Sequence, residues 1–242
     1  MLQIEFTGHV EPRFLQINAH GGPIPWKDKN LPPFAFSYRI DKAEVGILCD
    51  IQDVDEFAVN YVHLVVYSYI SSVINCLAFA TAHGFTLILE SCTVPGMEPA
   101  PLRSHSPALP SLCSFTSQEI LDVVMKDRRI LKPLNDLTDT LRNPMDSYVN
   151  IQRAIEGLCR LVSDEKDRHK RWEALRDNLK IGRPYLQFIS DLSTEARHGA
   201  TTPVEMVTVA NVQMRGWTIM NRFLEFWKRG KTALPISEFP LL

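Results

Sequence analysis

An arginine and a histidine stand side by side at the end of a predicted helix, in the segment Ser193-Thr194-Glu195-Ala196-Arg197-His198-Gly199. A guanidinium can bind a phosphate and an imidazole can exchange a proton near neutral pH, so the pair could cleave RNA without a metal. The same residues also suit a helix end, where basic side chains complement the helix dipole and glycine accepts a left-handed backbone. Arg197 and His198 are therefore interpreted either as a catalytic pair or as a helix cap.

The other common chemical motifs are missing from the sequence. It has no glycine-rich phosphate loop, no HExxH, no GxSxG and no paired-cysteine zinc pattern. The 7 histidines are never three or four residues apart, which is the spacing of two metal ligands on one helix. The 5 cysteines form no CxxC and fit free thiols in a reducing compartment. We therefore expect no metal, no cofactor and a cytoplasmic location.

Composition describes an ordinary globular chain with two unlike halves. The 242 residues are 45% hydrophobic and carry a formal net charge of −2. These values exclude a disordered acidic tail, a coiled-coil rod and a disulfide-stapled miniprotein. The slightly negative net charge also means that the chain as a whole does not attract nucleic acid. Residues 1–115 hold 6 basic and 11 acidic side chains, whereas residues 116–242 hold 20 and 17. Such a shift indicates two differently built parts.

The first part has the pattern of a small β-sheet with one helix. Short runs rich in β-branched and aromatic residues predict strands at Leu2–Phe6, Phe14–Asn18, Phe34–Ile40, Glu44–Ile51 and Phe85–Glu90. The glycines and prolines of HGGPIPWKDKNLPP predict a loop between the second and third of these strands. Strands combined with one long helix indicate an α+β module.

The helix of this module contains no charged residue from Phe57 to Ala82, a length that could span a bilayer. Polar residues nevertheless recur at steps of three and four and form a stripe along one helical face: Asn60, His63, Tyr67, Ser71 and Asn75. A lone spanning helix would rarely turn such a stripe toward lipid. We therefore predict a long buried helix packed against the sheet, and no membrane partner.

The second part is predicted to be an all-α helical bundle. Five prolines make 94–115 a linker, so the domains are 1–93, the linker, the bundle at 116–230 and an extended tail at 231–242. Helical periodicity and end signals place helices at Ser117–Arg129, Pro133–Leu141, Met145–Val162, within 164–180, Pro184–Arg197 and 203–229. Ser117 is the predicted cap of the first helix. Thr202, Pro203 and Glu205 form a predicted capping box for the last one.

The order of these elements resembles the HEPN superfamily. The resemblance is carried by a charged segment at 164–180, the ALRDNL helix around Trp172–Leu179, the helix Leu186–Gly199 that ends in RHG, and the long helix from Pro203. It covers about 85 residues, roughly a third of the chain. HEPN proteins include RNases of toxin, abortive-infection and CRISPR-linked systems, typically dimers with Arg-His motifs at the subunit interface. Other members are binding or assembly modules.

The sequence departs from the catalytic pattern of that superfamily. The HEPN RNase motif has four to six residues between its arginine and its histidine, and the matching positions before His198 hold Asp191, Leu192 and Ser193. Arg197 is adjacent to His198 instead, so on a helix the two side chains point about 100° apart. Arg153, on the predicted Met145–Val162 helix, could replace the missing arginine.

Two functions follow from these observations. The first is a bacterial or phage binding or assembly protein, with a HEPN-like bundle that forms a homodimer and binds RNA or another protein. The resemblance implies a setting in defence or stress. The second is a metal-independent RNase that uses His198 as acid and base and Arg197 or Arg153 to stabilise the phosphate.

Overall fold

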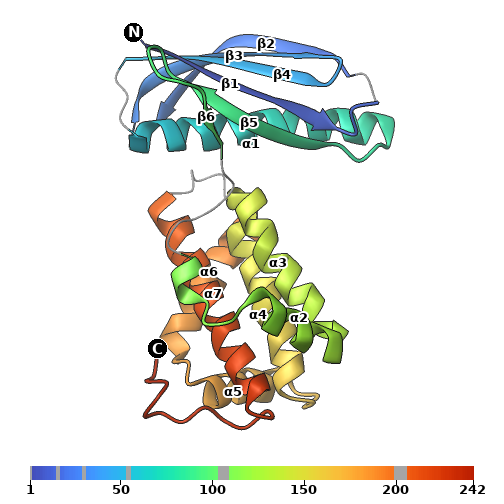
Figure 1. Cartoon of the computed structure of the whole chain (residues 1–242), viewed down its shortest axis with the longest axis vertical. Helices are drawn as coiled ribbons and strands as arrows, with labels where there is room; N and C mark the ends of the chain where they lie inside the picture. The colour runs from blue at the N-terminus through green and yellow to red at the C-terminus, as the bar shows by residue number, and fades with distance from the viewer. Residues whose placement is uncertain (1, 15–16, 29–30, 53–55, 103–108, 199–205) are drawn as a thin grey trace. The chain divides into compact units, whose positions relative to one another are not determined.

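The computed structural model describes residues 2–14, 17–28, 31–52, 56–102, 109–198 and 206–242. Contacts divide the chain into two compact units, Met1–Arg103 and Ser104–Leu242. The predicted fold class is confirmed: a sheet with one long helix comes first, and an all-helical region of six α-helices follows (Figure 1). Each unit is described by itself below.

The N-terminal unit is built on an antiparallel sheet, which has six strands in the described part of the chain, in the order β2-β3-β4-β1-β5-β6. The strands are β1 (Leu2–Glu11), β2 (Ala19–Asp28), β3 (Leu31–Asp41), β4 (Glu44–Ile51), β5 (Thr86–Thr93) and β6 (Ala100–Pro101). Alternating residues point to one face, so Ile4 and Phe6 of β1 lie beside Cys49 and Ile47 of β4, all fully buried. The sheet therefore has one apolar face that must be covered.

The strand prediction was wrong at two places: β6 (Ala100–Pro101) lies in the predicted linker 94–115, and β2 was not expected. The segment expected to be a loop, HGGPIPWKDKNLPP, forms most of β2 and the start of β3, while the end of the expected strand Phe14–Asn18 has no regular structure at residues 17–18. β2 lies at the edge of the sheet, where proline is tolerated because only one side of the strand forms hydrogen bonds with a neighbouring strand. Its pairing with β3 also shifts register between Gly21 and Ile24, which accommodates Pro23.

Helix α1 (Glu56–Thr81) covers the apolar face of the sheet (Figure 1). Val62, Val66, Ile70 and Ile74, at steps of four, are all buried. The predicted polar stripe does not form one exposed face, because His63 lies against Phe6 with ring centroids 5.8 Å apart, whereas Asn75 is exposed. The side chain of Asn60 lies outside the described part. α1 packs on the sheet as predicted, but the prediction of a buried helix was wrong, because only one face of α1 is buried.

One helix in the described residues, Tyr61–Thr81 of α1, is long and apolar enough to cross a membrane by length and composition, with a mean hydropathy of 1.6. The core helices of soluble proteins that pass the same test are mostly buried, whereas only 22% of this stretch is buried. The absence of a membrane partner stays a prediction.

The C-terminal unit contains helices α2 (Ser117–Lys126), α3 (Leu131–Arg142), α4 (Ser147–Val162), α5 (Arg168–Leu179), α6 (Arg183–Arg197) and α7 (Met206–Lys228). Short 3-10 turns at Pro110–Leu112, Arg128–Ile130 and Pro144–Asp146 precede α2, α3 and α4. α4 packs against α3, α5, α6 and α7, so it lies at the centre of the bundle. Its buried face supplies Ile151, Ile155 and Leu158 to the core. The predicted start of the last helix at Thr202 lies outside the described residues.

The chain end after α7 is fastened to the turn between α5 and α6. The amide of Gly182 donates to the carbonyl of Leu242 (3.0 Å), and the amide of Leu242 donates to the carbonyl of Lys180 (3.2 Å). The buried guanidinium of Arg222 donates to the carbonyls of Lys180 (2.6 Å) and Pro240 (2.8 Å). These bonds satisfy carbonyls that the end of α5 leaves free and hold the tail in place.

Candidate functional site

The segment that ends α6 has the geometry of a helix cap. The backbone amide of His198 donates to the carbonyls of Thr194 and Glu195, both at 3.1 Å. The Nε of Arg197 donates to the carbonyl of Ser193 one turn back (3.2 Å), which holds the guanidinium along its own helix. The His198 ring is exposed to solvent. Gly199 lies outside the described residues.

Arg153 is engaged elsewhere in the bundle. Its Nη2 lies 3.4 Å from an oxygen of Asp136 on α3, and the Lys132 ammonium lies 2.6 Å from the same oxygen. The Asp136 side chain is only 4% exposed, so it needs these cations to compensate the cost of its burial. Within the described residues, neither Arg153 nor Arg197 makes a hydrogen bond or ion pair with His198. The structure therefore does not join the three predicted site residues by direct polar contacts.

A buried polar cluster links three helices near the centre of the bundle. Gln213 on α7 donates from its amide to the carbonyl of Thr140 on α3 (2.9 Å) and to the hydroxyl of Ser147 on α4 (3.3 Å). All three side chains are buried. Because the Gln213 amide finds partners on both neighbouring helices, the cluster fixes the register of α3, α4 and α7.

Arg215 was not predicted as a notable residue, yet it is held between two aromatic rings. Its guanidinium carbon lies 4.5 Å from the ring centre of Tyr185 and 4.2 Å from that of Phe188, both on α6. Its nitrogens donate to the side chain of Asn211 (2.9 Å) and to the carbonyl of Tyr185 (3.0 Å). Burial raises the pKa of the Tyr185 phenol. An arginine within the otherwise uncharged stretch Met206–Asn221 is the sequence signal that could have indicated a role in helix packing.

The N-terminal unit has a charged cluster on the sheet face opposite α1. His9 is buried, with Nδ1 3.1 Å from Glu90 and Nε2 3.6 Å from Glu11. Arg13 lies 3.7 Å from Glu90 and 3.6 Å from Glu44. A register shift between Thr7 and Gly8 in the β1–β5 pair leaves Glu90 out of the ladder beside His9. Arg13 is thus paired with two carboxylates, whereas the buried Nδ1 of His9 lies close to Glu90 without making a hydrogen bond in the described residues.

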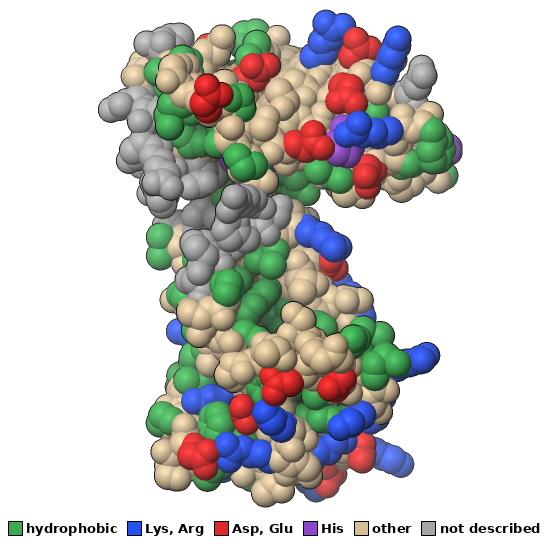
Figure 2. All heavy atoms as spheres, in the orientation of Figure 1, with side chains coloured by type: hydrophobic (Ala, Val, Ile, Leu, Met, Phe, Trp, Pro, Cys, Tyr) green, Lys and Arg blue, Asp and Glu red, His purple; other side chains and the backbone are tan. Residues whose placement is uncertain are grey.

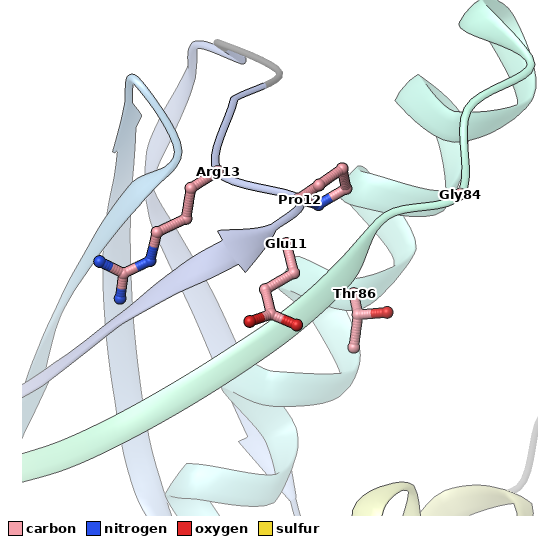
Figure 3. Close-up of a pocket in the computed structure, with 5 residues that line it drawn as sticks. All are labelled: Glu11, Pro12, Arg13, Gly84 and Thr86. Carbon is pink, nitrogen blue, oxygen red and sulfur yellow. The ribbon is translucent and has the colours of Figure 1, made fainter.

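A shallow hollow lies next to this cluster, at the end of β1 and the start of β5 (Figure 3). It is lined by Glu11, Pro12, Arg13, Gly84 and Thr86. Glu11 and Thr86 are neighbours on paired strands, whereas Arg13 extends away from them (Figure 3). The hollow is open to solvent and most of its lining residues are not apolar, whereas small-molecule sites are usually enclosed and mostly apolar.

Metal ligands and reactive thiols are not gathered in the described ranges. No group of three or more His, Cys, Asp or Glu side chains there could hold a metal ion. All five cysteines are free. Burial raises the pKa of the Cys49 and Cys159 thiols to about 12, so both stay protonated at neutral pH.

The charged segment at α5 carries both signs on its surface. Arg168 pairs with Glu156 at 3.2 Å, and the Asp167 side chain caps α5 by accepting from the amide of Lys170 (3.0 Å). Figure 2 shows basic and acidic side chains interspersed over this face of the bundle. Such a mixed surface gives a weak field toward phosphate compared with a continuous basic patch.

Comparison with known families identifies both units. Residues 4–102 match the N-terminal domain and residues 117–228 match the C-terminal domain of one family, described as a domain of unknown function, DUF8168. The chain belongs to this family. No curated protein and no solved structure matches the chain at a significant level.

Proposed function

We propose that this DUF8168 protein is a binding or assembly protein of the bacterial or phage cytoplasm, with a HEPN-like bundle and with two copies in its working form. The observation that carries this proposal is that both candidate arginines, Arg197 and Arg153, make contacts within the bundle instead of facing His198. Arg197 bonds to its own helix and Arg153 to Asp136, so both guanidiniums serve the structure of the bundle. The HEPN likeness would place such a protein in defence or stress, with RNA or another protein as its ligand.

Exposed apolar side chains on the bundle favour a protein ligand. Leu121 and Met125 lie one turn apart on α2 and are 50% and 62% exposed. Side chains at this spacing share one helical face and can enter a groove on a partner.

A metal-independent RNase is the second candidate function. The observation in its favour is the exposed ring of His198, since a proton-transferring imidazole must reach its substrate. In this function a phosphate would be bound by Arg197, or by Arg153 after it leaves Asp136.

An RNA-cleavage assay without metal separates the two functions. The full chain is compared with His198→Ala, and with His169→Ala as a matched control, because His169 is exposed on α5. Binding to the same RNA is measured in parallel on each sample. We expect no cleavage by any of the three. Cleavage that is lost only in His198→Ala would overturn the binding proposal in favour of the RNase.

A further inference from the structure

The outer side of helix α2 carries apolar side chains that the bundle leaves uncovered. Leu121 and Met125 are 50% and 62% exposed and lie one helical turn apart. Leu131, at the start of α3, is 42% exposed, so three exposed large apolar side chains fall within residues 121–131. α2 packs against α7 and against the 3-10 turn Arg128–Ile130, which leaves the side with Leu121 and Met125 free for a partner.

Basic residues follow at the C-terminal end of α2. They are Lys126, Arg128, Arg129 and Lys132. Two of them are bound within the bundle, because Arg129 lies 2.6 Å from Asp127 and Lys132 lies 2.6 Å from Asp136. Lys126 and Arg128 are exposed, and in the part of the chain that the structure describes they form no ion pair. Two uncompensated positive charges therefore follow Met125 closely along the chain.

The acidic residues of α2 do not cancel these two charges. Glu119 is already paired with Lys228 of α7 at 3.1 Å. Asp122 is exposed and accepts a hydrogen bond from the Gln118 amide (2.8 Å), which leaves its negative charge in place. With one free acid against two free cations, the unpaired charge on the outer side of α2 is positive.

Apolar side chains beside free cations fit an acidic amphipathic helix of a partner protein. Leu121 and Met125 form a ridge that can pack between rows of apolar side chains on a second helix. Methionine has a flexible and polarizable side chain, so this ridge can adapt to the shape of its partner. Carboxylates beside those rows would pair with Lys126 and Arg128, whereas a basic helix would be repelled. Charge thus selects among partners that the apolar residues alone would accept.

RNA fits this surface less well than an acidic helix does. Its phosphates would be attracted to the same two cations, but proteins that bind single strands also use aromatic rings on which the bases stack. Leu121 and Met125 provide no ring. A phosphate backbone lying over them would place charged groups against apolar ones. The observations therefore favour a protein segment over a nucleic acid.

We propose that the outer side of α2 binds an acidic amphipathic helix of a partner protein, with Leu121 and Met125 in the apolar contact and Lys126 and Arg128 paired with carboxylates of that helix. The inference rests on the proposed function, which includes a protein as ligand. It adds the chemistry of this ligand and its place on the bundle.

Fluorescence anisotropy with two designed peptides tests the chemistry of the partner. The acidic probe is a fluorescein-labelled helix of about 16 residues, with leucines at steps of three and four and with glutamates and alanines elsewhere. The basic probe has lysines in place of the glutamates. We expect the full-length protein to bind the acidic probe with a Kd at least about tenfold lower than that of the basic probe. Salt raised from about 0.05 M to about 0.5 M should weaken this binding severalfold, because the charges are exposed.

Two variants locate the binding on α2. Met125→Glu places a carboxylate in the apolar contact and should raise the Kd of the acidic probe at least about tenfold. Lys126→Glu/Arg128→Glu reverses both free cations and should raise the Kd by a similar factor. Asp122→Asn removes the free acid and should lower the Kd, which is the opposite direction.

Matched controls change the same residue types elsewhere. Ile236→Glu alters an apolar side chain that is 65% exposed in the tail. Lys166→Glu/Lys170→Glu makes the same change of net charge at exposed positions at and before the start of α5. Both controls should bind the acidic probe as the wild type does. All variants should keep the wild-type circular dichroism spectrum, because each changed side chain is exposed.

Other outcomes overturn the inference. Equal binding of the two probes would show that charge does not select the partner. Equal losses in Lys126→Glu/Arg128→Glu and Lys166→Glu/Lys170→Glu would show that net charge alone drives binding. Binding of a labelled oligouridine of about 12 nucleotides, lost in Lys126→Glu/Arg128→Glu, without binding of the acidic probe would assign the cations to RNA.

The failure of this inference can be told apart from the failure of the proposed function. A wild type that does not bind the acidic probe overturns the inference alone, because the metal-free RNA-cleavage assay tests the proposed function separately. RNA cleavage that depends on His198, in a protein that still binds the acidic probe through Met125, overturns the proposed function and keeps the contact on α2.

Discussion

Helices α1 and α7 are of similar length, 26 and 23 residues, but they are used differently. α7 packs against α2, α3, α4 and α5, and two of its charged residues, Arg215 and Arg222, are held by rings and carbonyls. α1 packs on one sheet face and has no charge after Glu56. A long helix with satisfied charges is a central element of a core, whereas an uncharged helix with one free side has a surface available for a partner.

The largest expected effect contrasts two phenylalanines on these helices. Phe223 of α7 is fully buried, so Phe223→Ala should cost about 3–5 kcal/mol of unfolding free energy through the cavity that it leaves. Phe79→Ala on α1 should change it by less than about 0.5 kcal/mol, because the ring is exposed. Urea denaturation followed by circular dichroism measures both. A large loss in Phe79→Ala for a monomeric sample would contradict the free face of α1.

Acid should weaken the sheet that α1 covers before it weakens the contact between α2 and α7. Burial lowers the pKa of His63 on α1 to about 4, below its unfolded value of 6.5. The unfolded chain therefore binds the proton more readily, so this stability is complete above pH 6.5 and is lost as the pH falls toward 4. Its size is at most about 3.4 kcal/mol.

Urea midpoints between pH 7 and pH 4 test this window. His63→Phe should flatten the pH dependence of the N-terminal unit, and His169→Gln, at an exposed position on α5, should not. On α2, the pKa of Glu119 is lowered to about 2, first by the Thr116 amide and then by Lys228 of α7. Its contribution is present above pH 4.5 and is lost as the pH falls toward 2. Loss of the bundle before the sheet would contradict this order.

In the sheet that α1 covers, strand β5 approaches Gly8 of β1 so closely that no larger residue fits there. A Cβ at Gly8 would lie 2.0 Å from the carbonyl oxygen of Ile88, at the irregularity of the β1–β5 pair. Gly8→Ala should therefore force the strands apart and cost about 1–3 kcal/mol of unfolding free energy. Gly46→Ala on β4 has no atom within 4 Å of its Cβ and should stay within about 0.5 kcal/mol. Equal urea midpoints for the two variants would contradict the close approach of β5.

The fold class could be predicted because each unit has its own periodicity. Runs of β-branched and aromatic residues in the first fifty residues and helical spacing after Phe115 do not depend on distant contacts. β2 was missed because glycine and proline are strong loop signals, and only the sheet order makes residues 19–28 an edge strand. Its pairing with β3 is a tertiary effect that outweighs local preference.

The candidate site could be predicted less well, since its chemistry depends on pairs that are distant in sequence. The adjacent Arg197 and His198 were visible, and the structure gives their backbone the geometry of a cap. The pairing of Arg153 with Asp136 and of Arg215 with Tyr185 depends on which helical faces meet. No local pattern determines how α3 packs on α4 or how α6 lies beside α7.

The smallest effect concerns the cap that begins the bundle. The sequence suggested Ser117 as the cap of α2, whereas in the structure Thr116 forms a capping box: its hydroxyl accepts from the Glu119 amide, and Glu119 accepts from the Thr116 amide. Glu119 also contacts Lys228 of α7 at 3.1 Å. Thr116→Ala should cost about 1 kcal/mol, and Ser117→Ala almost nothing. Tryptophan fluorescence during urea denaturation measures both, because Trp172, Trp217 and Trp227 lie in this unit. A larger loss of stability in Ser117→Ala than in Thr116→Ala would show that Ser117 is the cap and that α2 begins one residue later.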